Sequence, residues 1–373
     1  MKIDAFQVEQ WLTAYETKVK YNITKTSAVP VTIEELFQMM GEDLEAFWRD
    51  FSRRKLSYGD INGNPDFLRG VCGLYRTLSP EHIIPTHGTS GANHLLISAV
   101  VEPGDHVISV KPTYQQLYSI PDSLGAKVDI LHLRRENNYL PDIEELRSMV
   151  TEKTKLICIN NPDNPTGSLM DNAMLREVVE IARSCGAYLL SDEVYLPMRP
   201  KGVEIDCIAD LYEKGASTCS MSKAYSLAGL RIGWIATRSK ELLKACASHR
   251  EYTLISCGLF DEAVAALALR HVDKLLEKNL RLIAENLPVV DRWVAGEPHI
   301  SYLYPQAGTT ALLHYDMDID SVTFCRRLME ETGTFMVPGD CFDEPKSLRL
   351  GFAIDPEVLR SGLAELHEFL TQF

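Results

Sequence analysis

The stretch Ser220-Met-Ser-Lys-Ala-Tyr-Ser-Leu-Ala-Gly-Leu-Arg-Ile-Gly-Trp234 places a single lysine, Lys223, among small and apolar residues. A lysine in such surroundings loses hydration and its pKa falls, so its neutral amine can attack a carbonyl. Ser220 and Arg231 flank it, and a hydroxyl with a guanidinium suits a phosphate. A lysine amine, a carbonyl and a phosphate together indicate pyridoxal 5'-phosphate (PLP) as the ligand. The alternative is an ordinary lysine at the edge of a loop.

Two apolar runs upstream end in polar residues, a pattern typical of strands in an open α/β sheet. The run 155–159 precedes the turn Asn160-Asn-Pro-Asp-Asn-Pro-Thr-Gly167, and the run 187–191 precedes Asp192-Glu-Val-Tyr195. Because such sheets bind ligands at the carboxyl ends of their strands, we expect both segments to face one site. A buried Asp192 can keep the pyridine nitrogen of PLP protonated, which draws electrons from the substrate. The alternative is that Asp192 caps a helix.

A loop rich in small residues precedes both of these strands. In Ile84-Pro-Thr-His-Gly-Thr-Ser-Gly-Ala-Asn-His-Leu-Leu96, a short strand leads through Thr89 and Ser90 into an apolar helical run. The backbone N–H groups at the start of that helix, with the two hydroxyls, form an anion site suited to a phosphate. Tyr114 follows the next predicted strand, over residues 107–110, and can lie flat on the cofactor ring or simply pack in the core.

Taken in order, these motifs resemble the fold-type I PLP-dependent enzymes, and among them the class I/II aminotransferase family. The resemblance extends from about Ser57 to Phe352. It implies an α/β fold, with a large domain whose mostly parallel sheet is sandwiched by helices and a smaller α+β C-terminal domain. It also implies a homodimer, because Tyr58 matches the tyrosine that reaches the partner subunit's phosphate in this family.

The resemblance also implies residue roles. Lys223 would carry the internal aldimine and later move the proton of the substrate α-carbon. Asp192 would pair with the pyridine nitrogen, while Tyr195 and Asn164 would hydrogen-bond the 3'-oxygen. Arg349 would clamp the substrate α-carboxylate, with Asn164 beside it; otherwise Arg349 is a surface residue at a strand edge and Asn164 only a turn former. The implied cofactor-binding set is Tyr58, Thr89, Ser90, Gly91, Tyr114, Asn164, Asp192, Tyr195, Ser220, Ser222, Lys223 and Arg231.

Two departures from the family pattern bear on the reaction. Gly91 stands where many relatives carry Glu or Gln, and the N-terminal arm, over residues 20–27, lacks the usual glycine. The arm looks more like the subgroup that includes capreomycidine synthase. We expect an aminotransferase acting on an α-amino acid and an α-keto acid. The alternatives are a PLP-dependent lyase or cyclase, performing β-elimination or ring closure, and a non-catalytic PLP-binding protein, against which the complete set of catalytic positions counts.

Composition agrees with this interpretation. The chain has 373 residues, 45% of them apolar, and a formal charge of −14 without a basic block, which argues against a nucleic-acid partner. Nine cysteines without a Cys-x-x-Cys pair favour core residues in a reducing compartment and no metal site. Charged and polar residues near the N-terminus interrupt the apolar stretch that a signal peptide needs, and no apolar run is long enough to span a membrane. We therefore expect a soluble cytoplasmic protein.

Alternating strand and helix patterns, with amphipathic helices over residues 142–150 and 173–182, predict a mostly parallel sheet. We expect an N-terminal arm with a small-domain segment over residues 1–40. The large PLP-binding domain should span residues 41–260, and the small C-terminal domain residues 261–373. The chain is strongly helical around residues 262–269, where we place the crossing.

Substrate identity stays open at this stage. Acidic and amide groups after Tyr58 favour a basic or polar side chain: Asp60, Asn62 and Asn64. Basic groups on the arm favour an acidic one: Lys18, Lys20 and Lys25. Either set can simply face solvent, the commoner position of charged residues.

Overall fold

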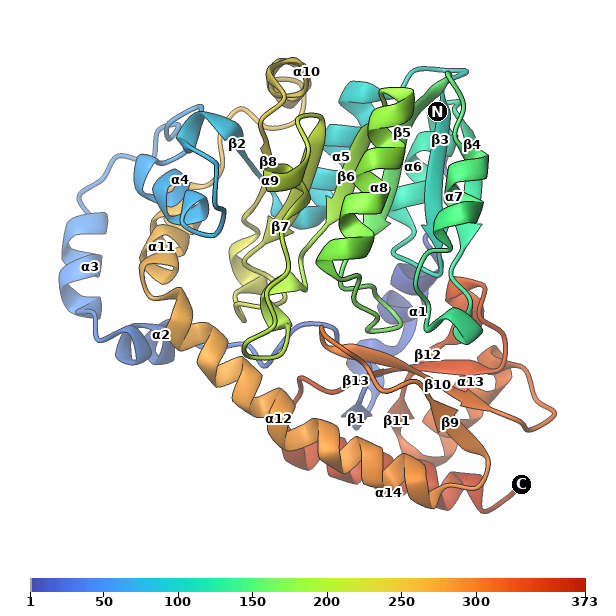
Figure 1. Ribbon diagram of the computed structural model, residues 1–373. Coiled ribbons are helices and arrows are strands. Elements are labelled where there is room, and N and C mark those ends of the chain that lie inside the picture. Colours follow the sequence, from blue (N-terminus) through green and yellow to red (C-terminus); the bar gives the residue numbers. More distant parts are fainter. Residues whose placement is uncertain (1) are drawn as a thin grey trace.

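A seven-stranded sheet forms the centre of the computed structural model, which describes residues 2–373 (Figure 1). All its neighbouring strands pair in parallel except β8, which is antiparallel to β2 and β7. In spatial order the strands are β2 (Ile83–Thr86), β8 (Gly233–Thr237), β7 (Gly215–Ser220), β6 (Tyr188–Asp192), β5 (Thr154–Asn160), β3 (His106–Lys111) and β4 (Lys127–His132). The strands predicted over 107–110, 155–159 and 187–191 are thereby confirmed.

Helices cover both faces of this sheet, because its central strands are apolar on both sides. On β5, Ile157 packs into one core and Cys158 into the opposite one. The Ile157 side is covered by α7 (Ile143–Met149), α8 (Asn172–Cys185) and α9 (Ile208–Leu211), the other by α5 (Gly88–Val100), α6 (Gln116–Ser123) and α10 (Lys240–Arg250). The helices predicted over 142–150 and 173–182 correspond to α7 and α8.

The ends of α8 show how the sequence defines these helices. The Asp171 side chain accepts a hydrogen bond from the Met174 amide at 2.8 Å, which satisfies one of the free N–H groups of the first turn. Gly186 ends the helix in the left-handed conformation, with φ of 71°. The chain then turns directly into β6, whose last residue is Asp192.

A second, four-stranded antiparallel sheet lies below the first in Figure 1. Its order is β12 (Val337–Pro338), β13 (Ser347–Gly351), β10 (Thr310–Tyr315) and β9 (Ile300–Tyr302), and it packs against α13 (Ser321–Thr332) and α14 (Pro356–Leu370). The N-terminal arm joins this core. Its strand β1 (Tyr21–Asn22) pairs in parallel with β11 (Thr334–Phe335), and Trp11 of α1 (Gln7–Tyr15) donates a hydrogen bond to the Met336 carbonyl at 2.9 Å.

Two helices lie at and beyond the predicted division at residues 260 and 261. Helix α11 (Leu259–Arg270) shares a core with α2 (Ile33–Met40), α4 (Pro65–Cys72) and the large sheet, and α3 (Leu44–Phe51) packs on the same core. The long helix α12 (Val272–Gly296) belongs to both units: Leu275 packs with α11, whereas Val290 packs with the C-terminal sheet. We propose that the large and small domains meet within α12, because its two ends pack into different cores. The sequence does not reveal this, since the periodicity of a helix does not indicate which core the helix covers.

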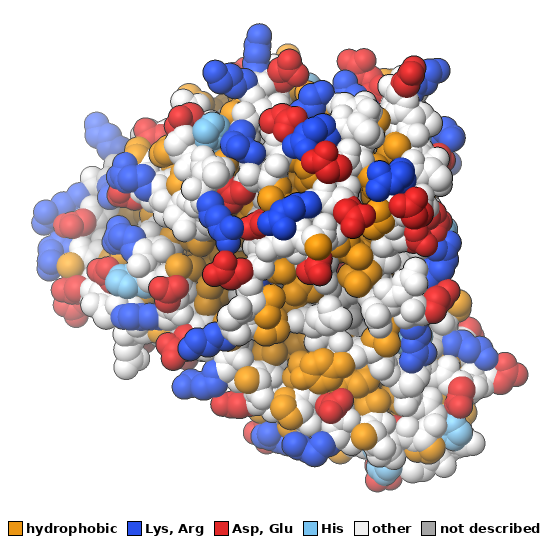
Figure 2. Space-filling view, viewed as in Figure 1, with side chains coloured by type: hydrophobic (Ala, Val, Ile, Leu, Met, Phe, Trp, Pro, Cys, Tyr) orange, Lys and Arg blue, Asp and Glu red, His pale blue; other side chains and the backbone are white. Residues whose placement is uncertain are grey.

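On the side viewed in Figure 2, hydrophobic side chains gather across the middle and lower part of the molecule. Figure 2 shows Lys and Arg side chains interspersed with Asp and Glu over this face. Within residues 2–373, every helix is too short or too polar to cross a membrane.

The close approach of the arm to β13 gives a test of this architecture. The Gly351 amide donates to the Ile23 carbonyl at 2.8 Å, and a Cβ at Gly351 would overlap the Lys25 backbone. We expect Gly351→Ala to lower the free energy of unfolding by about 1–3 kcal/mol, as overpacking does. The measurement is urea denaturation, with Gly296→Ala as the control because a Cβ there meets open space. Equal stabilities of the two variants would contradict this packing.

Candidate active site

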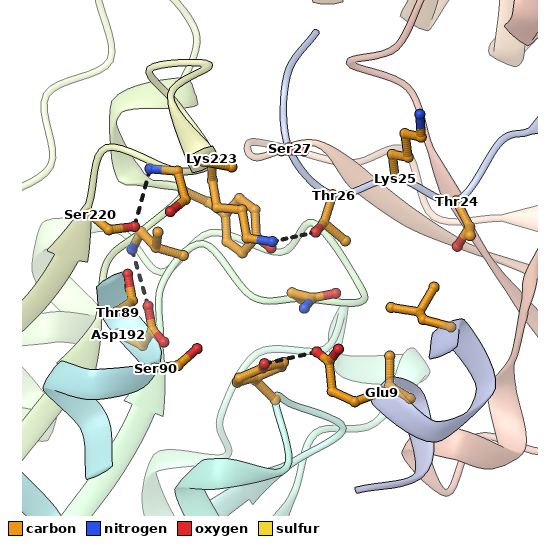
Figure 3. Close-up of a pocket in the computed structure, with 18 of the residues that line it drawn as sticks. Glu9, Thr24, Lys25, Thr26, Ser27, Thr89, Ser90, Asp192, Ser220 and Lys223 are labelled. Atoms are coloured by element: carbon orange, nitrogen blue, oxygen red, sulfur yellow. Dashed lines mark hydrogen bonds between the residues drawn. The ribbon is translucent and has the colours of Figure 1, made fainter. Parts of the chain in front are cut away.

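A cavity of about 500 Å³ lies between the two sheets and is closed by the N-terminal arm. Most of the predicted site residues line it: Thr89, Ser90, Tyr114, Asn164, Asp192, Tyr195, Ser220, Ser222, Lys223, Arg231 and Arg349. Figure 3 shows several of these side chains converging from opposite walls. Of the predicted residues, Gly91 and Tyr58 do not line the cavity; Gly91 lies inside α5, and Tyr58 is 72% exposed at the surface.

Lys223 projects into the cavity shortly after the end of β7. Its Nζ donates a hydrogen bond to Thr26 Oγ1 of the arm at 2.7 Å (Figure 3). Burial and, to a smaller extent, the charge of Arg349 together lower the pKa of Lys223 to about 8. The neutral amine is therefore accessible near physiological pH, as the sequence predicts.

Asp192, at the end of β6, is held from two sides. Asn93 Nδ2 donates to Asp192 Oδ2 at 2.8 Å, and the Val194 amide donates to Oδ1 at 3.2 Å. Asn93 is fixed in turn by Thr218, whose hydroxyl donates to Asn93 Oδ1 at 2.6 Å. Burial raises the pKa of Asp192 to about 6, although the hydrogen bond from Asn93 acts in the opposite direction and lowers this pKa. A cation beside this carboxylate would restore its charge. The residue that caps the next helical turn is Tyr195, so the helix-cap alternative for Asp192 is wrong.

The start of α5 and Arg231 form a positively polarised corner. Gly88 has φ of 70°, a conformation that favours glycine, and a Cβ there would lie 2.9 Å from Arg231 Nη2, so the guanidinium lies close to the start of the helix. Thr89 Oγ1 is buried and has no hydrogen-bond partner among residues 2–373. Ser220 and Ser222 add hydroxyls along the same wall. This set of hydroxyls, backbone N–H groups and one guanidinium fits a phosphate group.

Arg349 lies on β13, between β12 and β10, so the strand-edge alternative is wrong. Its side chain is only 2% exposed. Its guanidinium donates to Thr24 Oγ1 at 3.3 Å, the Thr24 carbonyl at 3.2 Å and Asn164 Oδ1 at 3.4 Å. Burial lowers the pKa of Arg349. Within residues 2–373 no carboxylate pairs with it, so a buried cation faces the cavity and an anionic ligand would complete it.

The turn after β5 holds Asn164 against this arginine, and Tyr195, which follows β6, lines the same cavity. The Asn164 amide donates to Asn160 Oδ1 at 2.8 Å, and Asn160 Nδ2 donates to the Asp192 carbonyl at 2.7 Å. The Asn164 side chain itself points to Arg349. Burial raises the pKa of Tyr195, so its hydroxyl stays protonated and can donate. Asn164 therefore does more than form a turn.

The arm supplies cavity residues that sequence reasoning did not identify. Helix α1 and the short 3-10 helix that follows it, η1 (Glu16–Lys18), contribute Glu9, Leu12 and Glu16. Tyr114 packs against Phe6 at 4.8 Å between ring centroids, and its hydroxyl donates to Glu9 Oε1 at 2.9 Å. The spacing of the three arm residues, which places them on one helix face, is the signal that could have revealed them. Sequence reasoning also did not identify Asn93 as the residue that holds Asp192.

The residues weighed for substrate choice are distributed differently from the prediction. Asp60 and Asn62 line a separate shallow hollow near Pro80. Of the arm lysines, Lys25 lines the cavity, whereas Lys18 and Lys20 do not. Within residues 2–373 no group of His, Cys, Asp and Glu side chains could hold a metal ion.

Known proteins resemble this chain over its whole length. A PLP-dependent aminotransferase from Streptococcus suis is 44% identical, with a TM-score of 0.97 over 100% of this chain and 99% of that one. Capreomycidine synthase from Streptomyces vinaceus is 29% identical over 99% of this chain and 94% of its own length. The PLP-dependent cyclase OrfR is 26% identical, with a TM-score of 0.90 over 100% of this chain and 98% of that one.

The family match covers residues 29–366 and is described as aminotransferase class I and II. This family match identifies PLP as the cofactor, in agreement with the positively polarised corner, the Lys223 amine and the Asp192 carboxylate. The chain belongs to the class I and II aminotransferase family.

Proposed function

We propose that this chain is an aminotransferase that moves an amino group between an α-amino acid and an α-keto acid in a ping-pong order. The observation that carries this proposal is that Lys223 lines the same cavity as Arg349, a buried cation that has no carboxylate partner among residues 2–373. An amine nucleophile and a carboxylate receptor in one site suit an α-amino acid. The 44% identity to a PLP-dependent aminotransferase favours transfer of the amino group.

Each cavity residue has a task in this reaction. Bound PLP supplies an aldehyde that combines with amines and a ring that withdraws electrons from the α-carbon. Arg349 would bind the α-carboxylate with two parallel hydrogen bonds and so fix which bond of the α-carbon is broken. Lys223 Nζ would accept the α-proton, because a pKa of about 8 keeps part of the amine neutral near pH 7. Asp192, held by Asn93, would keep the pyridine nitrogen protonated.

A lyase or cyclase is the second candidate, favoured by the similarity to capreomycidine synthase and to a PLP-dependent cyclase. Both reactions begin with removal of the same proton, so Lys223, Asp192 and Arg349 serve either outcome. The fate of the amino group separates them.

The first experiment supplies pools of α-amino acids to the PLP-loaded protein without any keto acid. For an aminotransferase we expect about one equivalent of keto acid per site and then arrest, since the amino group stays in the site until a keto acid removes it. Keto acid, ammonia and cyclised product are quantified by mass spectrometry. Continued turnover with ammonia or a ring product would assign a lyase or cyclase instead. Lys223→Ala should bind PLP but form none of these products, and unchanged product formation would exclude the proposed role of Lys223.

The low pKa of Lys223 predicts the pH dependence of cofactor capture. A protonated amine cannot attack the aldehyde, so the rate at which the PLP-free protein binds PLP covalently should rise through about pH 8. In Arg349→Gln the midpoint should move upward, because the positive charge of Arg349 lowers this pKa. The measurement is visible absorbance after mixing with PLP. A midpoint near 10.5, the ordinary value for lysine, would contradict the burial of the amine.

We also propose a homodimer in which Tyr58 reaches the phosphate site of the other copy. Tyr58 is exposed, does not line the cavity of its own chain and lies in the sequence between the exposed apolar residues Leu56 and Ile61. Tyr58→Phe should raise the dissociation constant of PLP about tenfold, the effect of losing a hydrogen bond to a charged group. Tyr252→Phe, which alters another exposed tyrosine, is the control. A monomer in sedimentation, or equal PLP affinity in both variants, would refute this arrangement.

A further inference from the structure

The proposed function uses only some of the charged side chains that line the cavity. Three cations and one carboxylate have tasks in the proposed function: Lys223, Arg231, Arg349 and Asp192. Three charged residues of the arm remain: Glu9, Glu16 and Lys25. Figure 3 shows the Glu9 carboxylate directed into the cavity, whereas the Lys25 side chain extends away from it.

One hydrogen bond from the cavity wall orients the Glu9 carboxylate. The Tyr114 hydroxyl donates to Glu9 Oε1 at 2.9 Å, and burial raises the pKa of Tyr114, so this hydroxyl stays a donor. The negative charge of Glu9 also raises the pKa of both Lys223 and Arg349, against the larger lowering effect of their burial. The carboxylate is therefore within electrostatic reach of both ends of the reacting centre. Within residues 2–373 it has no ion-pair partner.

The arm helix presents these groups as a strip. Glu9, Leu12 and Glu16 follow one another at intervals that place them on the same side of α1 and η1, and all three line the cavity. An apolar side chain thus separates two carboxylates. This pattern matches a ligand with a hydrocarbon stem and a positively charged end.

We propose that Glu9 and Glu16 form a subsite for a cation at the end of the substrate side chain. The substrate is then an α-amino acid whose apolar stem ends in an ammonium or guanidinium group. Arg349, the buried cation without a carboxylate partner, anchors the opposite end through the α-carboxylate. Two ends of opposite charge fix the direction in which the amino acid lies. This inference rests on the proposed function, because it assigns the α-carboxylate to Arg349.

Equilibrium binding tests the subsite without any reaction. Acids that lack the α-amino group are titrated calorimetrically into the PLP-loaded protein: 5-guanidinopentanoate, 6-aminohexanoate, uncharged hexanoate and the diacid hexanedioate. We expect the two cationic acids to bind about tenfold or more tightly than hexanoate, as a charge-assisted hydrogen bond allows. Tighter binding of one cationic acid than the other distinguishes guanidinium from ammonium recognition. Equal binding of hexanoate, or tighter binding of hexanedioate, would overturn the proposal.

Matched variants locate the effect. Glu9→Gln keeps the acceptor for Tyr114 and removes the charge, so it should abolish most of the preference for cationic acids while leaving hexanoate unchanged; Glu16→Gln should act in the same direction. Glu34→Gln removes an exposed carboxylate outside the cavity and should have no effect. Arg349→Lys should weaken all four acids alike. An unchanged preference in the Glu9→Gln and Glu16→Gln double variant would overturn the subsite.

The acceptor-free assay separates this inference from the proposed function. If amino acids with neutral or acidic side chains react as well as lysine and arginine, the subsite is refuted and the aminotransferase assignment stands. If no amino acid reacts and none of the acids binds, both are refuted.

Discussion

The site depends on one contact, between arm residues 24–28 and the two cationic side chains that face each other across the cavity. Thr24 accepts hydrogen bonds from Arg349 through both its hydroxyl and its carbonyl, and Thr26 accepts one from Lys223. The Ala28 amide donates to the Lys223 carbonyl at 3.1 Å. Lys223 follows β7 of the large sheet and Arg349 lies on β13 of the small one, so this short segment connects the two through hydrogen bonds.

Burial acts against the ordinary charge of the principal groups. It raises the pKa of Asp192 to about 6 and lowers that of Lys223 to about 8, and Arg349 has no counter-ion among the described residues 2–373. Each group is held by neutral hydrogen-bond partners such as Asn93, Thr26 and Asn164, which orient it without cancelling its charge. A ligand that carries a phosphate, a ring nitrogen and a carboxylate supplies the missing charges. The protein is thus arranged in advance for ligand charges.

The sequence predicted the parts of the site that depend on local signals. Apolar runs that end in Asn160 and Asp192 identify strand ends, and the small residues around Lys223 identify a reactive amine. The contacts of Arg349 with Thr24 join residues 325 positions apart, and no local pattern announces such a pairing. Glu9 and Glu16 were missed because charges on a short helix are typical of a solvent-exposed face. Helix α11 was assigned to the C-terminal domain because its composition does not reveal which core it joins.

The pairing of β1 with β11 determines when the site can exist. Tyr21 lies opposite Thr334 and Asn22 opposite Phe335, so the first strand of the chain finds its partner only after nearly all the rest has been synthesised. Until then the arm cannot close the cavity, although the strand that carries Lys223 towards it is complete. Contacts between such distant segments form late and slowly. A nascent chain on the ribosome can therefore hold a folded central sheet whose cavity is still open, and the cavity is completed only when the segment that carries β11 has been synthesised.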